Sequence, residues 1–104
     1  MTPAHEAVEH GDLLRLRDLL DGGVDVEEIE GGLTLLQHAI DVELDEHVQS
    51  GEPLQVNVTA YLLARGADPL ASSLAPGGSA LHMARLGGHW LAVALIESTA
   101  KRRH

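Results

Sequence analysis

A short motif occurs three times along the chain and limits the folds open to it more than any other feature. Residues 2–7 read TPAHEA, residues 34–39 read TLLQHA, and residues 79–84 read SALHMA. Each copy begins with a hydroxyl side chain that can cap a helix, and each ends with an alanine small enough for close helix packing. Such recurrence predicts a repeat architecture in which each unit stacks on its neighbours.

The residues after each motif predict a pair of helices joined by a glycine turn. Gly11 and Gly88 can adopt the left-handed conformation that ends a first helix. An apolar stripe at helical spacing then predicts a second helix in the first copy: Leu13, Leu16, Leu19 and Leu20. Gly23 and Gly66 are expected to end second helices, and the glycine pair at 31–32 is expected to form a tight turn before the next cap.

These features resemble the ankyrin repeat, a unit of roughly 33 residues with a T-P-L-H-x-A signature. The resemblance covers nearly the whole chain and implies an all-α fold, a short solenoid of helix–turn–helix repeats with β-turn fingers. It implies a single ankyrin-repeat domain over residues 1–104, with repeats at roughly 1–32, 33–78 and 79–104. The second repeat matches the signature most loosely.

The second repeat carries an acidic insertion of about 11 residues, at roughly 41–53, which reads DVELDEHVQSGEP. Ile40, Leu44 and Val48 are four residues apart, so the first helix of this repeat is expected to continue for two extra turns until residues 50–53 break it. The other face of that helix is expected to carry Asp41, Glu43, Asp45, Glu46 and His47. This extension is either a binding surface or a tolerated surface insertion.

Charge is divided unevenly between the two halves of the chain. Residues 1–52 contain 14 acidic side chains and two arginines, whereas residues 53–104 have a net charge of +3. The total of −9 argues against a protein that binds nucleic-acid phosphates. The asymmetry is consistent with a surface that attracts a basic partner, and equally with one that only keeps a small protein in solution.

The resemblance implies a protein-binding module, because ankyrin proteins usually bind partners along the fingers and inner helices. The finger between the first two repeats contains Glu27, Glu28 and Glu30. We therefore expect the fingers and the extended helix to form an acidic surface for a basic protein. A sharper hypothesis is an inhibitor or immunity-type protein, whose carboxylates occupy the place of substrate phosphates in a basic enzyme. The alternative is an assembly or scaffold protein that self-associates through its apolar C-terminal repeat, which contains Trp90.

Catalytic and metal-binding functions find little support in the sequence. The chain has no cysteine, no G-x-S-x-G and no H-x-x-x-H motif. His5 and His82 occupy the signature histidine position, where the resemblance implies a hydrogen bond from the ring to the backbone. We expect no enzyme activity, no catalytic residue, no metal and no cofactor. No apolar run approaches the ~20 residues of a membrane span, so we expect a cytoplasmic protein without a membrane partner; the oligomeric state is left open.

Overall fold

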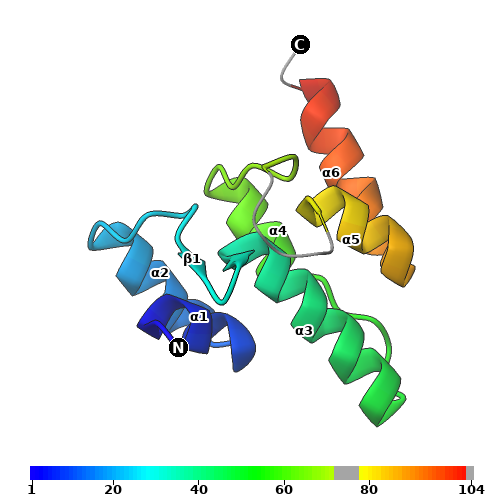
Figure 1. The fold of residues 1–104 in the computed structure, drawn as a ribbon, viewed down its shortest axis with the longest axis horizontal. Helices are drawn as coiled ribbons and strands as arrows, with labels where there is room; N and C mark the ends of the chain where they lie inside the picture. Colours follow the sequence, from blue (N-terminus) through cyan, green and yellow to red (C-terminus); the bar gives the residue numbers. More distant parts are fainter. Residues whose placement is uncertain (72–77, 103–104) are drawn as a thin grey trace.

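Three helix pairs lie side by side in the computed structural model, which describes residues 1–71 and 78–102 (Figure 1). The pairs are α1 (Pro3–Glu9) with α2 (Leu13–Asp21), α3 (Leu35–Ser50) with α4 (Asn57–Ala64), and α5 (Ala80–Gly87) with α6 (Trp90–Arg102). The first helices pack on one another in the order α1, α3, α5, and α4 packs on α6. None of the helices described is long and apolar enough to cross a membrane.

A two-stranded hairpin forms the finger between the first and second pairs. Strand β1 (Ile29–Glu30) runs antiparallel to β2 (Leu33–Thr34), with Ile29 opposite Thr34. The two residues between the strands, Gly31 and Gly32, have φ angles of 61° and 81°. A two-residue hairpin of this kind requires positive φ at both positions, which glycine adopts without strain. The tight turn predicted from the glycine pair is confirmed.

The predicted helix caps are present at the start of each repeat. The Thr2 hydroxyl accepts a hydrogen bond from the His5 amide at 3.1 Å, and the Ser79 hydroxyl accepts one from the His82 amide at 3.2 Å. Thr34 forms a capping box, in which its hydroxyl and the side chain of Gln37 each accept a backbone amide of the other residue. The local signals of the motif therefore fix where α1, α3 and α5 begin.

The core is aliphatic, as a chain without phenylalanine requires. Its largest fully buried apolar side chains come from all three pairs: Val8, Leu16, Leu35, Leu36, Ile40, Leu62 and Ile96. Each large apolar side chain buried in this way contributes roughly 1.5–3 kcal/mol. Of the stripe predicted on α2, Leu16 and Leu20 are buried, whereas Leu13 stays partly exposed.

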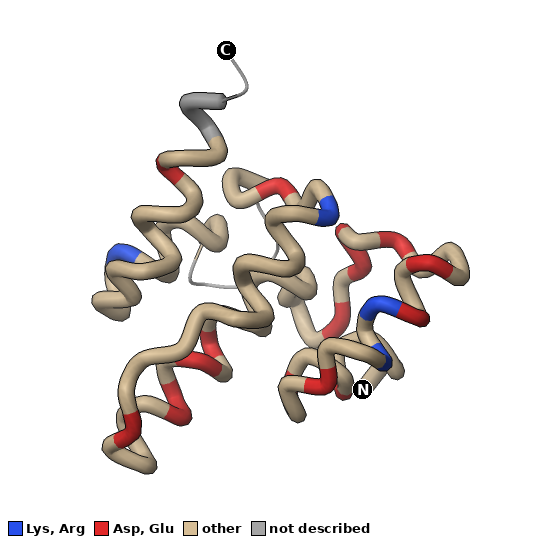
Figure 2. Tube along the Cα trace, turned by 180° about the vertical axis from the view of Figure 1, so that it is seen from behind, with Lys and Arg blue, Asp and Glu red and all other residues tan. Residues whose placement is uncertain are grey.

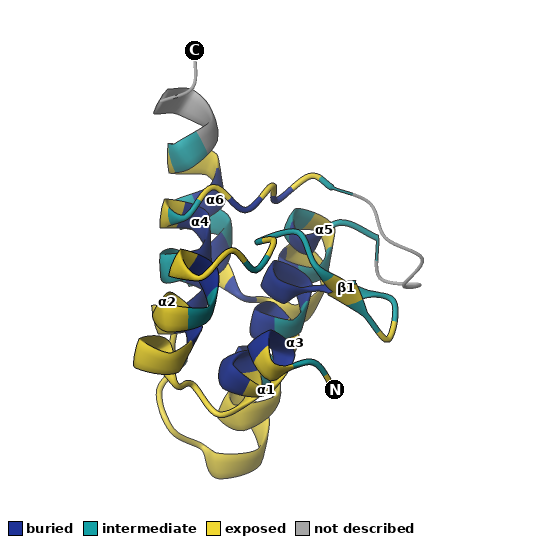
Figure 3. Ribbon diagram, turned by 90° about the vertical axis from the view of Figure 1, so that its left-hand side faces the viewer, coloured by how far each residue is buried: buried dark blue, intermediate teal, exposed yellow. Residues whose placement is uncertain are grey.

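Helix α3 continues beyond the stack, as the spacing of its apolar residues predicts. Its 16 residues end at Ser50, where Gly51 takes the left-handed conformation. Leu44 still packs on the third repeat, because a Cβ atom added at Gly87 would collide with its side chain. Val48, one turn later, is 79% exposed. The last turns of α3 and the loop to α4 therefore extend into solvent, as the exposed residues at the foot of Figure 3 show.

Candidate functional site

The acidic side chains predicted to form one binding surface lie in two groups. The finger acids, Glu27, Glu28 and Glu30, come shortly before the N-terminus of α3. The extension acids lie from the middle of α3 onward: Asp41, Glu43, Asp45 and Glu46. A helix of 16 residues is about 24 Å long, so the two groups lie near opposite ends of it. Figure 2 shows them as separate clusters, one near the first helix pair and one at the far end of α3.

The finger acids are half-buried and hydrogen-bonded to the chain itself. Glu28 accepts from the Thr2 hydroxyl at 3.0 Å. Glu30 accepts from the Thr2 amide and pairs with the N-terminal amino group, each at 3.0 Å. These contacts lower the pKa of the Glu30 carboxyl and raise the pKa of the amino group. Glu27 accepts from the Asp68 amide at 2.9 Å. The finger acids thus hold the finger in place as well as carrying charge.

The outer side of the extension presents Asp41, Asp45, Glu46 and His47 to solvent. Asp45 accepts hydrogen bonds from the Gln49 side chain, and His47 donates from Nδ1 to the Glu52 carbonyl at 2.6 Å. Residues 18–64 contain no lysine or arginine, and the ion pairs found among the described residues do not involve these acids. Their negative charge therefore faces solvent, with no ion pair to these carboxylates in the part of the chain that the structure describes.

The sequence-based expectation that Glu43 lies on the exposed face of the extension is wrong. Glu43 is only 6% exposed, and three donors surround its carboxylate. Oε1 accepts from the Thr59 hydroxyl at 2.6 Å and from His89 Nε2 at 2.8 Å, and Oε2 accepts from the Thr59 amide at 3.3 Å. The helical period explains the burial, because Glu43 follows Ala39 by four residues and Ile40 by three, and both are buried.

Glu43 and His89 together support the starts of two helices. Val56 precedes α4 without a side-chain cap, and the Glu43 carboxylate instead receives the Thr59 amide in the first turn. The Ala92 amide donates to His89 Nδ1 at 3.2 Å, so this nitrogen is unprotonated and Nε2 carries the hydrogen that is donated to Glu43. Sequence reasoning missed this cluster because its members are 16 and 46 residues apart.

The two signature histidines differ. His5 is buried, with Nε2 3.0 Å from the Leu33 carbonyl oxygen in the finger and Nδ1 2.7 Å from Thr2 Oγ1, as the resemblance implied. His82 is exposed, and among the described residues its ring has no hydrogen-bond partner, so the implied bond to the backbone stays a prediction there. The carbonyl that His5 contacts belongs to the finger that follows its own repeat.

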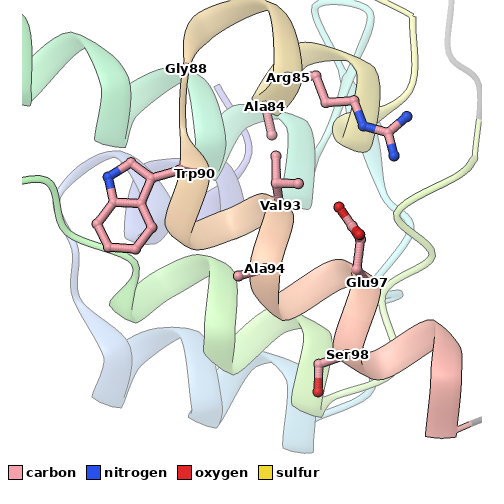
Figure 4. Close-up of a pocket in the computed structure, with 8 residues that line it drawn as sticks. All are labelled: Ala84, Arg85, Gly88, Trp90, Val93, Ala94, Glu97 and Ser98. Carbon is pink, nitrogen blue, oxygen red and sulfur yellow. The ribbon is translucent and has the colours of Figure 1, made fainter.

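The C-terminal repeat leaves a groove of about 640 Å³ between α5 and α6. Eight residues line it: Ala84, Arg85, Gly88, Trp90, Val93, Ala94, Glu97 and Ser98 (Figure 4). Trp90 is 67% exposed, whereas Leu91, Val93 and Leu95 are half-buried. Part of this apolar segment therefore packs inward, whereas the tryptophan remains exposed. The described residues contain no group of three His, Asp or Glu side chains placed to hold a metal ion.

Stacked helix pairs with a hairpin finger between them define a helical-repeat protein. Among solved structures, the chain is similar to the human ASB11 ankyrin repeat domain, with a TM-score of 0.64 and 25% sequence identity. The match covers 97% of this chain and 39% of that chain, so the present sequence spans about two fifths of its length. The chain has the ankyrin-repeat fold, which confirms the fold predicted from the sequence. No protein-family model matches the sequence, and no curated protein matches it.

Proposed function

We propose that this chain is a non-catalytic protein-binding module that engages a basic protein through the exposed side of the α3 extension. The extension surface consists of Asp41, Asp45, Glu46 and His47. The similarity to an ankyrin repeat domain supports protein binding in general. The observation that carries the acidic surface is the placement of exposed carboxylates on a projecting helix in a segment without any lysine or arginine.

The finger acids have a secondary role in this proposal. Because Glu27, Glu28 and Glu30 already accept hydrogen bonds from the chain, a partner would have to compete for them. They still add to the negative field that steers a basic partner toward the molecule. Glu43 is removed from the proposed contact, since its carboxylate is buried. The contact is therefore narrower than the surface expected from the sequence.

The sharper form of the proposal is inhibition of a basic enzyme. An enzyme that acts on a phosphate backbone presents cations at its substrate site, and carboxylates on a projecting helix can occupy that site. In this form the extension enters the site and the rest of the stack keeps the helix rigid. Inhibition that disappears at high salt is the expected sign, because exposed charges more than about 10 Å apart are largely screened at ~0.1 M salt.

The test compares wild type with Asp45→Lys/Glu46→Lys as baits for host proteins. The matched control is Glu6→Lys/Glu9→Lys, which makes the same charge change at two exposed positions of α1. We expect wild type and the control to retain a basic protein at low salt and the extension variant to lose it. The retained protein is then purified and titrated with all three baits, and assayed for inhibition if it is an enzyme. Equal binding by all three, or loss by the control alone, would contradict the proposal.

A further inference from the structure

The base of the α3 extension is attached to the turn between α5 and α6. Glu43 reaches His89, just before α6, with its Oε1 2.8 Å from His89 Nε2. Leu44, the next residue of α3, lies against Gly87 at the end of α5, where an added Cβ atom would collide with the leucine side chain. Two consecutive residues of α3 therefore contact the two ends of one short turn.

The residue types in this turn fit the two contacts. Gly87 belongs to α5 and does not have a positive φ angle, so the backbone conformation does not require glycine there. The missing side chain instead makes room for Leu44. His89 is fully buried, although residues 85–88 and Trp90 are exposed. The turn thus offers a space for one residue of the extension and a buried donor for the other.

The part of α3 beyond this attachment stands alone. Residues 45–50 are all exposed. Among the described residues, their side-chain hydrogen bonds stay within residues 45–52. The last fixed point of the helix is therefore the pair Glu43 and Leu44. Because a helix is held together by its own backbone hydrogen bonds, the placement of these two residues sets the direction of the exposed residues that follow.

We propose that the turn at residues 87–89 is a positioning element, which holds the extension in the direction that presents Asp45 and Glu46. The third repeat then controls the acidic contact without forming part of it. A surface that is already held in place loses less conformational freedom when a partner binds than a mobile surface does. This consequence for recognition rests on the proposed function, whereas the direction of the extension is a property of the chain alone.

Two variants loosen the attachment and retain the helices on either side. His89 Nδ1 accepts the Ala92 amide at 3.2 Å, as an N-cap side chain does, and the asparagine of His89→Asn is suited to the same role. Its shorter side chain does not reach Glu43, which then has one donor fewer. In Gly87→Leu the new side chain takes the space of Leu44, whereas leucine favours a helix more than glycine does.

The measurement is the distance between two spin labels, which can be attached selectively because the chain has no cysteine. Leu14→Cys on α2 and Val48→Cys on the extension are exposed positions, so the pair reports the direction of the extension relative to the stack. We expect one narrow distance distribution, which shifts or broadens when His89→Asn or Gly87→Leu is added. An unchanged distribution in both variants overturns the proposal.

A reference pair and a control variant separate positioning from stability. The reference pair, Leu14→Cys with Ala64→Cys on α4, is expected to keep its distribution in both attachment variants. A change there as large as at residue 48 overturns the proposal, because the stack as a whole would have moved. The control is Ser79→Ala, which removes the cap at the other end of α5 from Gly87.

The control is expected to leave the distance to residue 48 unchanged. A shift as large as in the attachment variants would show that the extension responds to the stability of the third repeat and not to the turn, and it overturns the proposal. Neither measurement uses a partner. A chain that captures no basic protein but responds to His89→Asn as expected would contradict the proposed function alone, and the reverse pair of results would contradict this inference alone.

Discussion

The finger acids and the extension acids have the same chemistry but different relations to the fold. Finger acids receive hydrogen bonds from residues 1, 2 and 68, so they link segments that are distant in sequence. Extension acids receive at most a bond from their own helix and face solvent. Glu43 is the exception within the extension. Like the finger acids, it accepts hydrogen bonds from residues that are distant in sequence. Negative charge in this chain therefore serves stability in some places and is free for recognition in others.

The sharpest test of this comparison sets Glu43 against Glu46, three residues later on the same helix. Glu43→Lys puts a cation beside His89 Nε2–H and two donors of Thr59, and leaves all three donors without an acceptor. We expect a loss of about 3–5 kcal/mol in the free energy of unfolding. Glu46 is exposed, so the free energy of unfolding of Glu46→Lys is expected to stay within about 0.5 kcal/mol of the wild-type value. Urea unfolding of both variants measures the difference, and equal losses would show that Glu43 is not anchored as described.

A second pair of variants compares the stability contributed by the buried first half of α3 with that contributed by its extension. Leu36 is 1% exposed, and Leu36→Ala is expected to cost about 2–5 kcal/mol because it leaves a cavity in the stack. A domain of this size has only about 5–15 kcal/mol of stability, so the variant unfolds at markedly lower denaturant. Val48→Ala changes an exposed residue and is expected to have little effect. A loss at Val48 close to that at Leu36 would indicate that the extension packs on the molecule.

A smaller effect is expected in the finger. Glu27→Ala removes the acceptor of the Asp68 amide, a bond between the finger and the segment that follows α4. We expect a loss of about 0.5–1.5 kcal/mol in the free energy of unfolding, since the amide regains a bond to water. Asp45→Ala is the control, because it removes only a bond to Gln49 on the same exposed helix. Equal stability of the two variants would show that the finger acids do not stabilise the fold more than the extension acids do.

The smallest effect concerns pH and the ring of His38, at the protected end of α3. Burial lowers the pKa of His38, and the neighbouring His5 lowers it further. The unfolded ring titrates near ~6.5, so as pH falls below that value the unfolded state takes up a proton before the folded state does, and stability decreases. His38→Gln is expected to reduce the loss of stability between about pH 7.5 and 5.5. Chemical denaturation at the two pH values measures this loss of stability, and His82→Gln, at an exposed position, is the control. If His38→Gln and wild type lose the same stability, the pH dependence does not come from His38.

Local signals were sufficient for the starts of α1, α3 and α5. Thr2, Thr34 and Ser79 cap the helices that they were predicted to cap, and the paired glycines at 31–32 form the predicted hairpin turn. The continuation of α3 to Ser50 also followed from the four-residue spacing of its apolar side chains. These features depend on residues within one or two helical turns of each other, so their energies are set by neighbours in sequence.

The roles of individual charged and polar residues were not accessible in the same way. Glu43 was expected in solvent and is buried, because Thr59 of α4 and His89, just before α6, satisfy its carboxylate. His82 shares the signature position of His5 but is exposed, whereas His5 is buried against the finger. Burying a charged or polar group costs free energy unless partners surround it, and only the tertiary structure determines whether they do.

The sequence by itself determined the repeat, the starts of α1, α3 and α5, and the existence of an acidic projecting helix. Only the tertiary structure decided which of the acids remain free, because that depends on donors 16 to 46 residues away. It also decided that the two ends of the stack differ, with exposed Arg15 and Asp18 at one end and the open groove beside Trp90 at the other. The physical reason is the same in both cases, because burial and partnership are properties of surfaces that meet only when the repeats stack.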